Sequence, residues 1–106
     1  MDYKKLTEDL IKAKQAAIEA AEGDDGGSAN LDAMTLRVPY TRESKVVEAI
    51  KEAGLFCRGR SEWIGPCYFI QPPKCGQGDS RYRAVTAMAK AMEQAGYSVL
   101  VYHQMD

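Results

Sequence analysis

The sequence predicts an α+β fold, and two observations carry that prediction. After an N-terminal helical segment, the hydrophobic pattern runs strand, helix, strand, strand, helix, strand. Residues 46–55 also align with residues 88–97 at an offset of 42 residues, and each segment ends a helix in Ala-Gly before a strand. This β-α-β-β-α-β order with an internal repeat predicts a ferredoxin-like domain, a four-stranded antiparallel sheet with two helices on one face. The expected elements are strand 33–39, helix 42–53, strand 55–60, strand 66–71, helix 79–95 and strand 97–105.

The first 30 residues are expected to form an arm and a linker outside this core. Residues 1–22 carry apolar side chains at three- and four-residue steps, and Asp2 can cap the helix. Residues 23–30, GDDGGSAN, have the composition of a flexible linker, so the core domain spans residues 31–106. The narrow apolar stripe of the helix has three alternative partners: its own domain, a second copy of the chain in a homodimer, or another protein.

Threonine, proline and glycine residues mark the ends of the expected core elements. Pro39 is expected to end the first strand, and Thr41 to cap the helix that follows it. Gly54 and Gly96 are expected to end the two core helices, because glycine adopts the left-handed backbone that often follows a helix.

The composition is that of a globular domain, with 106 residues, 45% hydrophobic and 27% charged. No apolar run approaches the roughly 20 residues of a membrane span, and the N-terminus lacks the uninterrupted apolar stretch of a secretory signal. Three cysteines at unequal spacing are typical of free thiols in a reducing compartment. We therefore expect a cytoplasmic protein without a membrane segment.

The net charge of −1 is divided unevenly along the chain. Residues 1–35 carry four lysines against eight acids, whereas residues 36–106 carry ten lysines and arginines against seven acids. The predicted core is therefore mildly basic, which favours an anionic ligand but falls short of the strongly basic surface of a dedicated nucleic-acid binder.

No group of residues has the pattern of a catalytic or metal centre. Cys57, Cys67, Cys75 and His103 include the donors of a zinc site, but their spacing contains no CxxC pair. A cysteine nucleophile would depend on the single histidine as its base. The glycine-rich loop that acylphosphatases carry after their first strand is replaced here by VPYTR, residues 38–42. We therefore expect no enzyme activity, no catalytic residue, no metal and no cofactor.

Groups suited to recognition are concentrated in residues 58–83, which hold the single tryptophan, two arginine pairs and a glycine-rich loop. Two glycines allow close approach of the backbone, and the amides at the start of the next helix could receive a phosphate. The alternative is an ordinary loop with Asp79 as the helix cap. The residues predicted for this anion site are Gly76, Gly78, Ser80, Arg81 and Arg83.

The open face of the expected sheet is a second candidate surface. Arg58 and Arg60 are two residues apart and are expected to share a face, whereas the adjacent Tyr68 and Phe69 must point to opposite faces. The topology resembles that of RNA-recognition modules, which stack bases on aromatic residues of the central strands, although residues 66–67 depart from their third-strand pattern. The residues predicted for this surface are Arg37, Arg58, Arg60, Trp63 and Tyr68.

These features predict a non-enzymatic binding domain for an anionic ligand, either nucleic acid (RNA or DNA) or a small nucleotide. The sheet face and the glycine-rich loop would form its contacts. The alternative is a small protein-interaction module, an inhibitor or adaptor that binds a protein partner through the N-terminal helix and the hairpin. In style, such a chain is similar to phage- or mobile-element-encoded inhibitors, including anti-defence proteins. Salt distinguishes the two, because phosphate contacts weaken steeply as salt rises.

Overall fold

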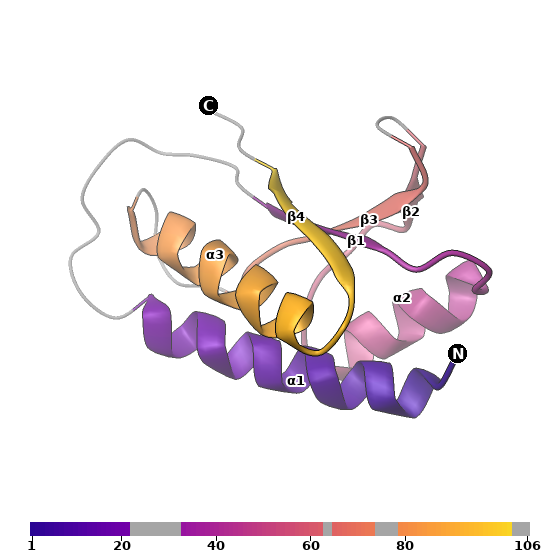
Figure 1. Cartoon of the computed structure of the whole chain (residues 1–106), viewed down its shortest axis with the longest axis horizontal. Coiled ribbons are helices and arrows are strands. Elements are labelled where there is room, and N and C mark those ends of the chain that lie inside the picture. The colour runs from indigo at the N-terminus through magenta and orange to yellow at the C-terminus, as the bar shows by residue number, and fades with distance from the viewer. Residues whose placement is uncertain (22–32, 63–64, 74–78, 103–106) are drawn as a thin grey trace.

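The computed structural model describes residues 1–21, 33–62, 65–73 and 79–102. Over these residues the chain is an α+β structure with three helices and a four-stranded antiparallel sheet (Figure 1), which confirms the predicted class. In this part of the chain no helix is long and apolar enough to cross a membrane. The predicted linker at 23–30 lies outside the described residues. In chain order the elements are α1 (Tyr3–Ala20), β1 (Ala33–Arg37), α2 (Glu43–Glu52), β2 (Arg60–Ser61), β3 (Cys67–Ile70), α3 (Asp79–Gln94) and β4 (Ser98–Tyr102).

The sheet has the strand order β2-β3-β1-β4 and separates two faces. Leu36 of β1 is paired with Tyr68 of β3 and with Val99 of β4, so these three side chains share one face. All three are buried, and Figure 1 shows the three helices on one side of the sheet. Alternation places Phe69 and Leu100 on the other face, where Leu100 is 64% exposed. The prediction that Tyr68 and Phe69 point to opposite faces is therefore confirmed.

The N-terminal helix α1 belongs to the same core as the sheet. Its apolar stripe, made of Leu6, Leu10, Ala13 and Ala17, is fully buried and joins the cluster that includes residues of α2, α3 and the strands. Figure 1 shows α1 running beneath both α2 and α3, and it contacts both. Of the three alternatives for this stripe, the structure shows the first, packing on its own domain. The sequence predicted an arm outside the core because the composition of residues 23–30 is that of a flexible linker. That composition does not indicate where the helix before it packs.

The start of α2 differs from the prediction, because Thr41 does not cap it. The helix begins at Glu43, and its N-cap residue, Arg42, makes no capping bond through its side chain. The Thr41 hydroxyl instead donates a hydrogen bond to the Val38 carbonyl. The backbone amide of Arg42 donates to the hydroxyl of Tyr3 at 3.0 Å, so α1 supplies an acceptor beside the start of α2. By contrast, the predicted Asp2 cap of α1 is confirmed by its bond from the Lys5 amide.

The two core helices end in the same hydrogen-bonding motif, as the internal repeat predicts. Gly54 has a φ of +80°, and its amide donates to the Lys51 carbonyl while the Leu55 amide donates to the Ile50 carbonyl. This pair of bonds is a Schellman motif. Gly96, with a φ of +99°, and the residue after it repeat both bonds at the end of α3. Both predicted helix stops are therefore confirmed.

The predicted strand at 55–60 forms only in part, because the edge of the sheet bulges. β2 comprises two residues, Arg60–Ser61, and the pairing before it is an isolated bridge between Phe56 and Gln71. The two pairings differ in register by one residue, and Gly59 between them has a φ of +133°. Such a bulge interrupts the ladder and the alternation of side chains, and it shields an edge strand from pairing with another chain.

The carboxylate of Asp9 connects α1 to the end of α3. It accepts hydrogen bonds from the Tyr97 hydroxyl at 2.8 Å and from the Lys5 ammonium at 2.7 Å, and its side chain is only 12% exposed. Burial acts to raise the pKa of Asp9, but the hydrogen bonds from Lys5 and Tyr97 and the charges of Lys5 and Lys12 outweigh it, so the pKa is lowered. Burial and the bond to Asp9 together raise the pKa of Tyr97.

Replacing Leu10 with alanine is expected to lower the free energy of unfolding by about 2–5 kcal/mol, because it leaves a cavity in the layer between α1 and the rest of the core. Urea denaturation followed by circular dichroism measures this change. The matched control is Ile11→Ala at the next position, which is 48% exposed and should change stability by no more than about 0.5 kcal/mol. Equal, small losses in both variants would contradict the packing of α1 described above.

Stability is also expected to depend on pH through Asp9. Because its folded-state pKa is depressed, its contribution is present above the unfolded-state pKa, about 3.9, and is lost as pH falls through the folded-state value. The melting temperature of the wild type should therefore fall more steeply than that of Asp9→Asn between about pH 5 and pH 2. Glu8→Gln removes an exposed charge at the neighbouring position and should keep the wild-type profile. Parallel profiles for the wild type and Asp9→Asn would argue against this role.

Candidate functional site

A hollow of about 550 Å³ opens at one end of the sheet. It lies where β1 ends and where β3 and β4 begin, since Arg37 is paired with Ser98 and the preceding residue of β1 with Tyr68. Its walls include the turn at residues 38–41 and Arg60 of the edge strand. This volume lies within the range of about 300–1,000 Å³ that small-molecule sites occupy.

Tyr68 forms a buried wall of the hollow. Its side chain is 2% exposed, and its hydroxyl oxygen is buried without a hydrogen bond from any described residue. Burial raises the pKa of this hydroxyl, and the charge of Arg60 lowers it by less. The pKa is therefore raised overall, and the hydroxyl stays protonated at neutral pH. A buried polar group without a partner costs about 1–3 kcal/mol. An oxygen atom of a ligand would remove that cost by accepting the hydroxyl proton in a hydrogen bond.

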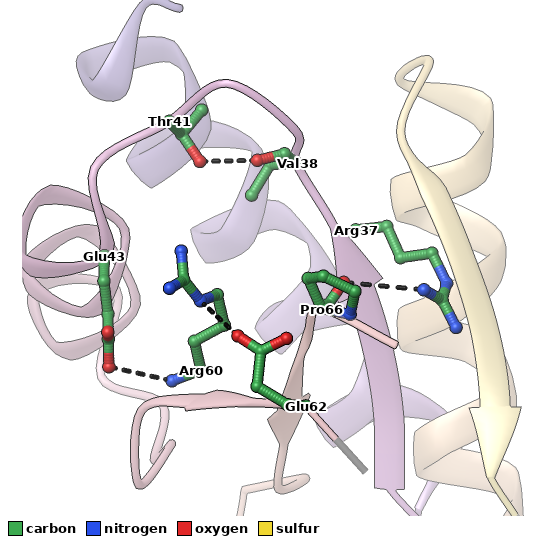
Figure 2. A network of polar contacts seen from close by, with 7 residues as sticks. All are labelled: Arg37, Val38, Thr41, Glu43, Arg60, Glu62 and Pro66. Atoms are coloured by element: carbon green, nitrogen blue, oxygen red, sulfur yellow. Dashed lines mark hydrogen bonds and ion pairs between the residues drawn. The ribbon is translucent and has the colours of Figure 1, made fainter. Parts of the chain in front are cut away.

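Arg60 supplies a cation on the same face of the sheet as Tyr68, with which it is paired in register. Its Nε donates to Oε1 of Glu62 at 3.0 Å, and its backbone amide donates to Oε2 of Glu43 on α2 at 3.0 Å (Figure 2). The side chains of Arg60 and Glu62 are 42% and 64% exposed. An exposed ion pair of this kind contributes about 0–1 kcal/mol, so an anionic ligand can compete with Glu62 at little cost.

Arg37 supplies a second cation on the other side of Pro66. Its Nη1 donates to the Pro66 carbonyl over a long 3.5 Å contact. A Cβ at Gly65, whose φ is +94°, would lie 2.9 Å from the same nitrogen, so glycine leaves room for the guanidinium group. Figure 2 shows the guanidinium groups of Arg37 and Arg60 on either side of Pro66. The hollow therefore presents two separate cationic groups, which suits a ligand with more than one acceptor group.

The turn that borders the hollow holds Tyr40 in an unusual conformation. Its φ is +61°, and it is the one non-glycine residue of the described chain with a positive φ. Such a backbone costs about 1–3 kcal/mol for a residue with a side chain. The side chain is fully exposed. Tyr40 is not among the residues predicted from the sequence, where Pro39 only indicates the end of a strand. The one signal in the sequence is an aromatic residue at the third position of a turn, where glycine or asparagine is favoured.

The predicted open cationic face does not form from Arg37 and Arg60. By register Arg60 lies on the helix-covered face with Tyr68, whereas Arg37 lies on the opposite face. Arg58 is exposed and does not line the hollow, and the bulge at Gly59 removes the reason to place it with Arg60. The structure therefore brings together three predicted residues, Arg37, Arg60 and Tyr68, around the end of the sheet, with Arg37 on the open face and the other two on the helix-covered face.

The arginines predicted for the loop site have structural partners. Arg81 donates to the side-chain oxygen of Gln71 at 2.6 Å, and Gln71 follows β3 at the end opposite the hollow. Nε of Arg83 donates to the carbonyl of Ala20 at 3.0 Å, where a cation stabilises the C-terminal end of α1. The glycine-rich loop thus stays a separate prediction. The remaining predicted groups, Trp63, Gly76, Gly78 and the side chain of Ser80, lie outside the described residues.

The thiols of the described chain do not have the environment of reactive groups. Cys57 is half-buried and Cys67 is buried, and burial raises the pKa of both. A thiol that stays protonated is a poor nucleophile. Within the described residues, no three His, Cys, Asp or Glu side chains are grouped so that they could hold a metal ion. Cys75 and His103 lie outside this part of the chain.

Comparisons of the chain with protein-family models, with curated proteins and with solved structures found no match. A functional proposal therefore rests on the groups that border the hollow. Two guanidinium groups and a buried phenol are hydrogen-bond donors, and this set of donors suits the oxygens of a phosphate or carboxylate.

Replacing Tyr68 with phenylalanine is expected to raise the stability of the unliganded protein by about 1 kcal/mol, because it removes a buried hydroxyl without a partner. Thermal denaturation measures the effect. Tyr97→Phe is the matched control with the opposite sign, since its hydroxyl donates to Asp9 and its loss should destabilise the fold. Destabilisation of similar size in both variants would mean that the Tyr68 hydroxyl already has a partner in solution.

Proposed function

We propose that this chain is a non-enzymatic binding domain for an anionic ligand, a nucleotide or a nucleic acid, seated in the hollow at the end of the sheet. The observation that carries the proposal is the buried hydroxyl of Tyr68, which has no hydrogen-bond partner among the described residues and lies on the same face as the cationic Arg60. An acceptor oxygen satisfies the hydroxyl, and its negative charge is matched by the guanidinium group.

The charges around the hollow support an anion over a cation. The two carboxylates near Arg60 are engaged, Glu62 with the Arg60 side chain and Glu43 with its backbone amide. Arg37 adds a second positive group to the wall. The Tyr68 hydroxyl is buried, so a ligand in the hollow can reach it only after a neighbouring side chain changes rotamer. The exposed and weakly paired Arg60 is suited to such a change.

We also propose that β1-α2-β2-β3-α3-β4 is a ferredoxin-like arrangement with α1 added to its helical layer. The antiparallel order β2-β3-β1-β4 and the shared C-terminal motif of α2 and α3 support this assignment. A reducing compartment such as the cytoplasm is proposed on the free thiols of Cys57 and Cys67.

A different surface favours the second candidate function, a protein-interaction module that acts as an inhibitor or adaptor. On the sheet face opposite the helices, Leu100 is 64% exposed, and the rings of Phe69 and Tyr102 pack edge to face with centroids 5.3 Å apart. An exposed leucine beside two partly exposed aromatic rings suits the core of a protein interface. The origin of such a module in a phage or mobile element stays a prediction of the sequence.

The proposed site predicts that Arg60→Gln weakens binding of inorganic phosphate and AMP by about tenfold or more, because a charge-assisted hydrogen bond is lost. NMR titration with amide chemical shifts measures both affinities and locates the site. Arg58→Gln is the matched control, because it removes the same charge from an exposed position two residues away that does not line the hollow. Affinity should fall as salt rises from 50 to about 200 mM. Equal losses in both variants, or shifts away from the hollow, would contradict the proposal.

A further inference from the structure

Tyr40 is the most exposed large hydrophobic residue of the described chain, and it stands at the border of the hollow. Other exposed apolar residues, such as Phe56 at 60% and Leu100 at 64%, keep part of their surface covered, whereas Tyr40 has none covered. It shares the wall of the hollow with Arg60 and Tyr68. The ring is uncovered and lies beside a set of hydrogen-bond donors for an anion, so a planar group of a ligand bound there can reach it.

The residues on either side of Tyr40 constrain the backbone of the turn. Pro39 before it restricts the backbone, and the hydroxyl of Thr41 after it donates to the Val38 carbonyl across the turn. In Figure 2 the chain between Val38 and Thr41 curves over the space that Arg60 occupies. Glycine and asparagine are the residues that favour this left-handed conformation. A bulky aromatic residue here is therefore an exception to local backbone preference.

We infer that the ligand of this hollow is a nucleotide unit, with its phosphate on Arg60 and Tyr68 and its base stacked on the ring of Tyr40. This inference rests on the proposed function and specifies its ligand. Base stacking on an aromatic ring tolerates any base, because every base has a π face. A hollow of about 550 Å³ holds more than a phosphate ion, and a second cation, Arg37, also lines it.

Three ligands separate the contributions of base and phosphate. AMP has both groups, ribose 5-phosphate lacks the base, and adenosine lacks the phosphate. NMR titration or calorimetry should rank AMP above both of the others. Tyr40→Gly should weaken the binding of AMP by about tenfold or more and leave the affinity for ribose 5-phosphate unchanged, because only the stacking is lost. Tyr40→Phe keeps the ring and should keep the wild-type affinity for AMP.

Loss of fold does not confuse this test, because glycine adopts the φ of +61° freely and Tyr40→Gly should melt at or above the wild-type temperature. If Tyr40→Gly binds AMP as the wild type does, the stacking inference is wrong while anion binding stands. If Arg60→Gln binds ribose 5-phosphate as tightly as the wild type, the proposed function itself fails. A protein partner in place of a nucleotide would show as no AMP binding in the wild type, which overturns both.

The same titrations distinguish the two sources of a nucleotide unit. A single-stranded oligonucleotide of four adenylates that binds at least tenfold more tightly than AMP, with a steeper loss of affinity in salt, identifies the unit as part of a nucleic-acid strand. Equal affinities identify a free nucleotide. In either case Tyr40→Gly should lower the affinity for the ligand that binds. An oligonucleotide whose affinity is the same for Tyr40→Gly and the wild type would overturn the inference.

Discussion

The structure depends on the burial of one apolar stripe, the face of α1 that packs beneath α2 and α3. α2 has only ten residues, and the inner face of α3 alternates methionines with small side chains, so two helices alone would cover little apolar surface. Leucines in the first half of α1 and alanines in the second fill the layer between them. Hydrophobic burial of this kind is non-directional, and polar contacts then set where each end of the helix lies. The Asp9–Tyr97 bond and the Arg83–Ala20 bond hold α1 against α3.

This packing extends to the hollow through a short chain of hydrogen bonds. The hydroxyl of Tyr3, at the start of α1, accepts a hydrogen bond from the backbone amide of Arg42, the N-cap residue of α2. The next residue, Glu43, accepts the amide of Arg60 and so fixes the edge strand beside α2. The short strand β2 has little pairing of its own, and this carboxylate compensates for the bulge before it. These bonds act together with the strand pairing of Arg60 and Tyr68, so the positions of α1 and α2 help to fix Arg60 beside the hollow.

Departures from ordinary local preferences gather at the hollow. Tyr40 has a left-handed backbone, and the Tyr68 hydroxyl is buried without a partner among the described residues. The helix ends, by contrast, follow local preference: Asp2 caps α1, and glycines end α2 and α3 in matching motifs. In proteins whose levels of structure are otherwise consistent, such exceptions are expected at functional sites. Their concentration at one end of the sheet, beside two cations, is what distinguishes this hollow from the groove between α1 and α2, where lysines and glutamates are mixed.

The sequence alone determined the features that depend on neighbouring residues: the types and order of the elements, the helix stops at Gly54 and Gly96, and the opposite faces of Tyr68 and Phe69. These follow from backbone preferences and from the periodicity of side chains within a few residues. For the candidate site, the sequence identified side chains with suitable chemistry. It placed Arg58 and Arg60 on one face by strand alternation, and the bulge at the sheet edge interrupts that alternation. The tertiary structure alone decided that the N-terminal helix enters the core and that Tyr40 stands at the border of the hollow. Those positions depend on contacts between segments far apart in the chain, and local preferences do not encode them.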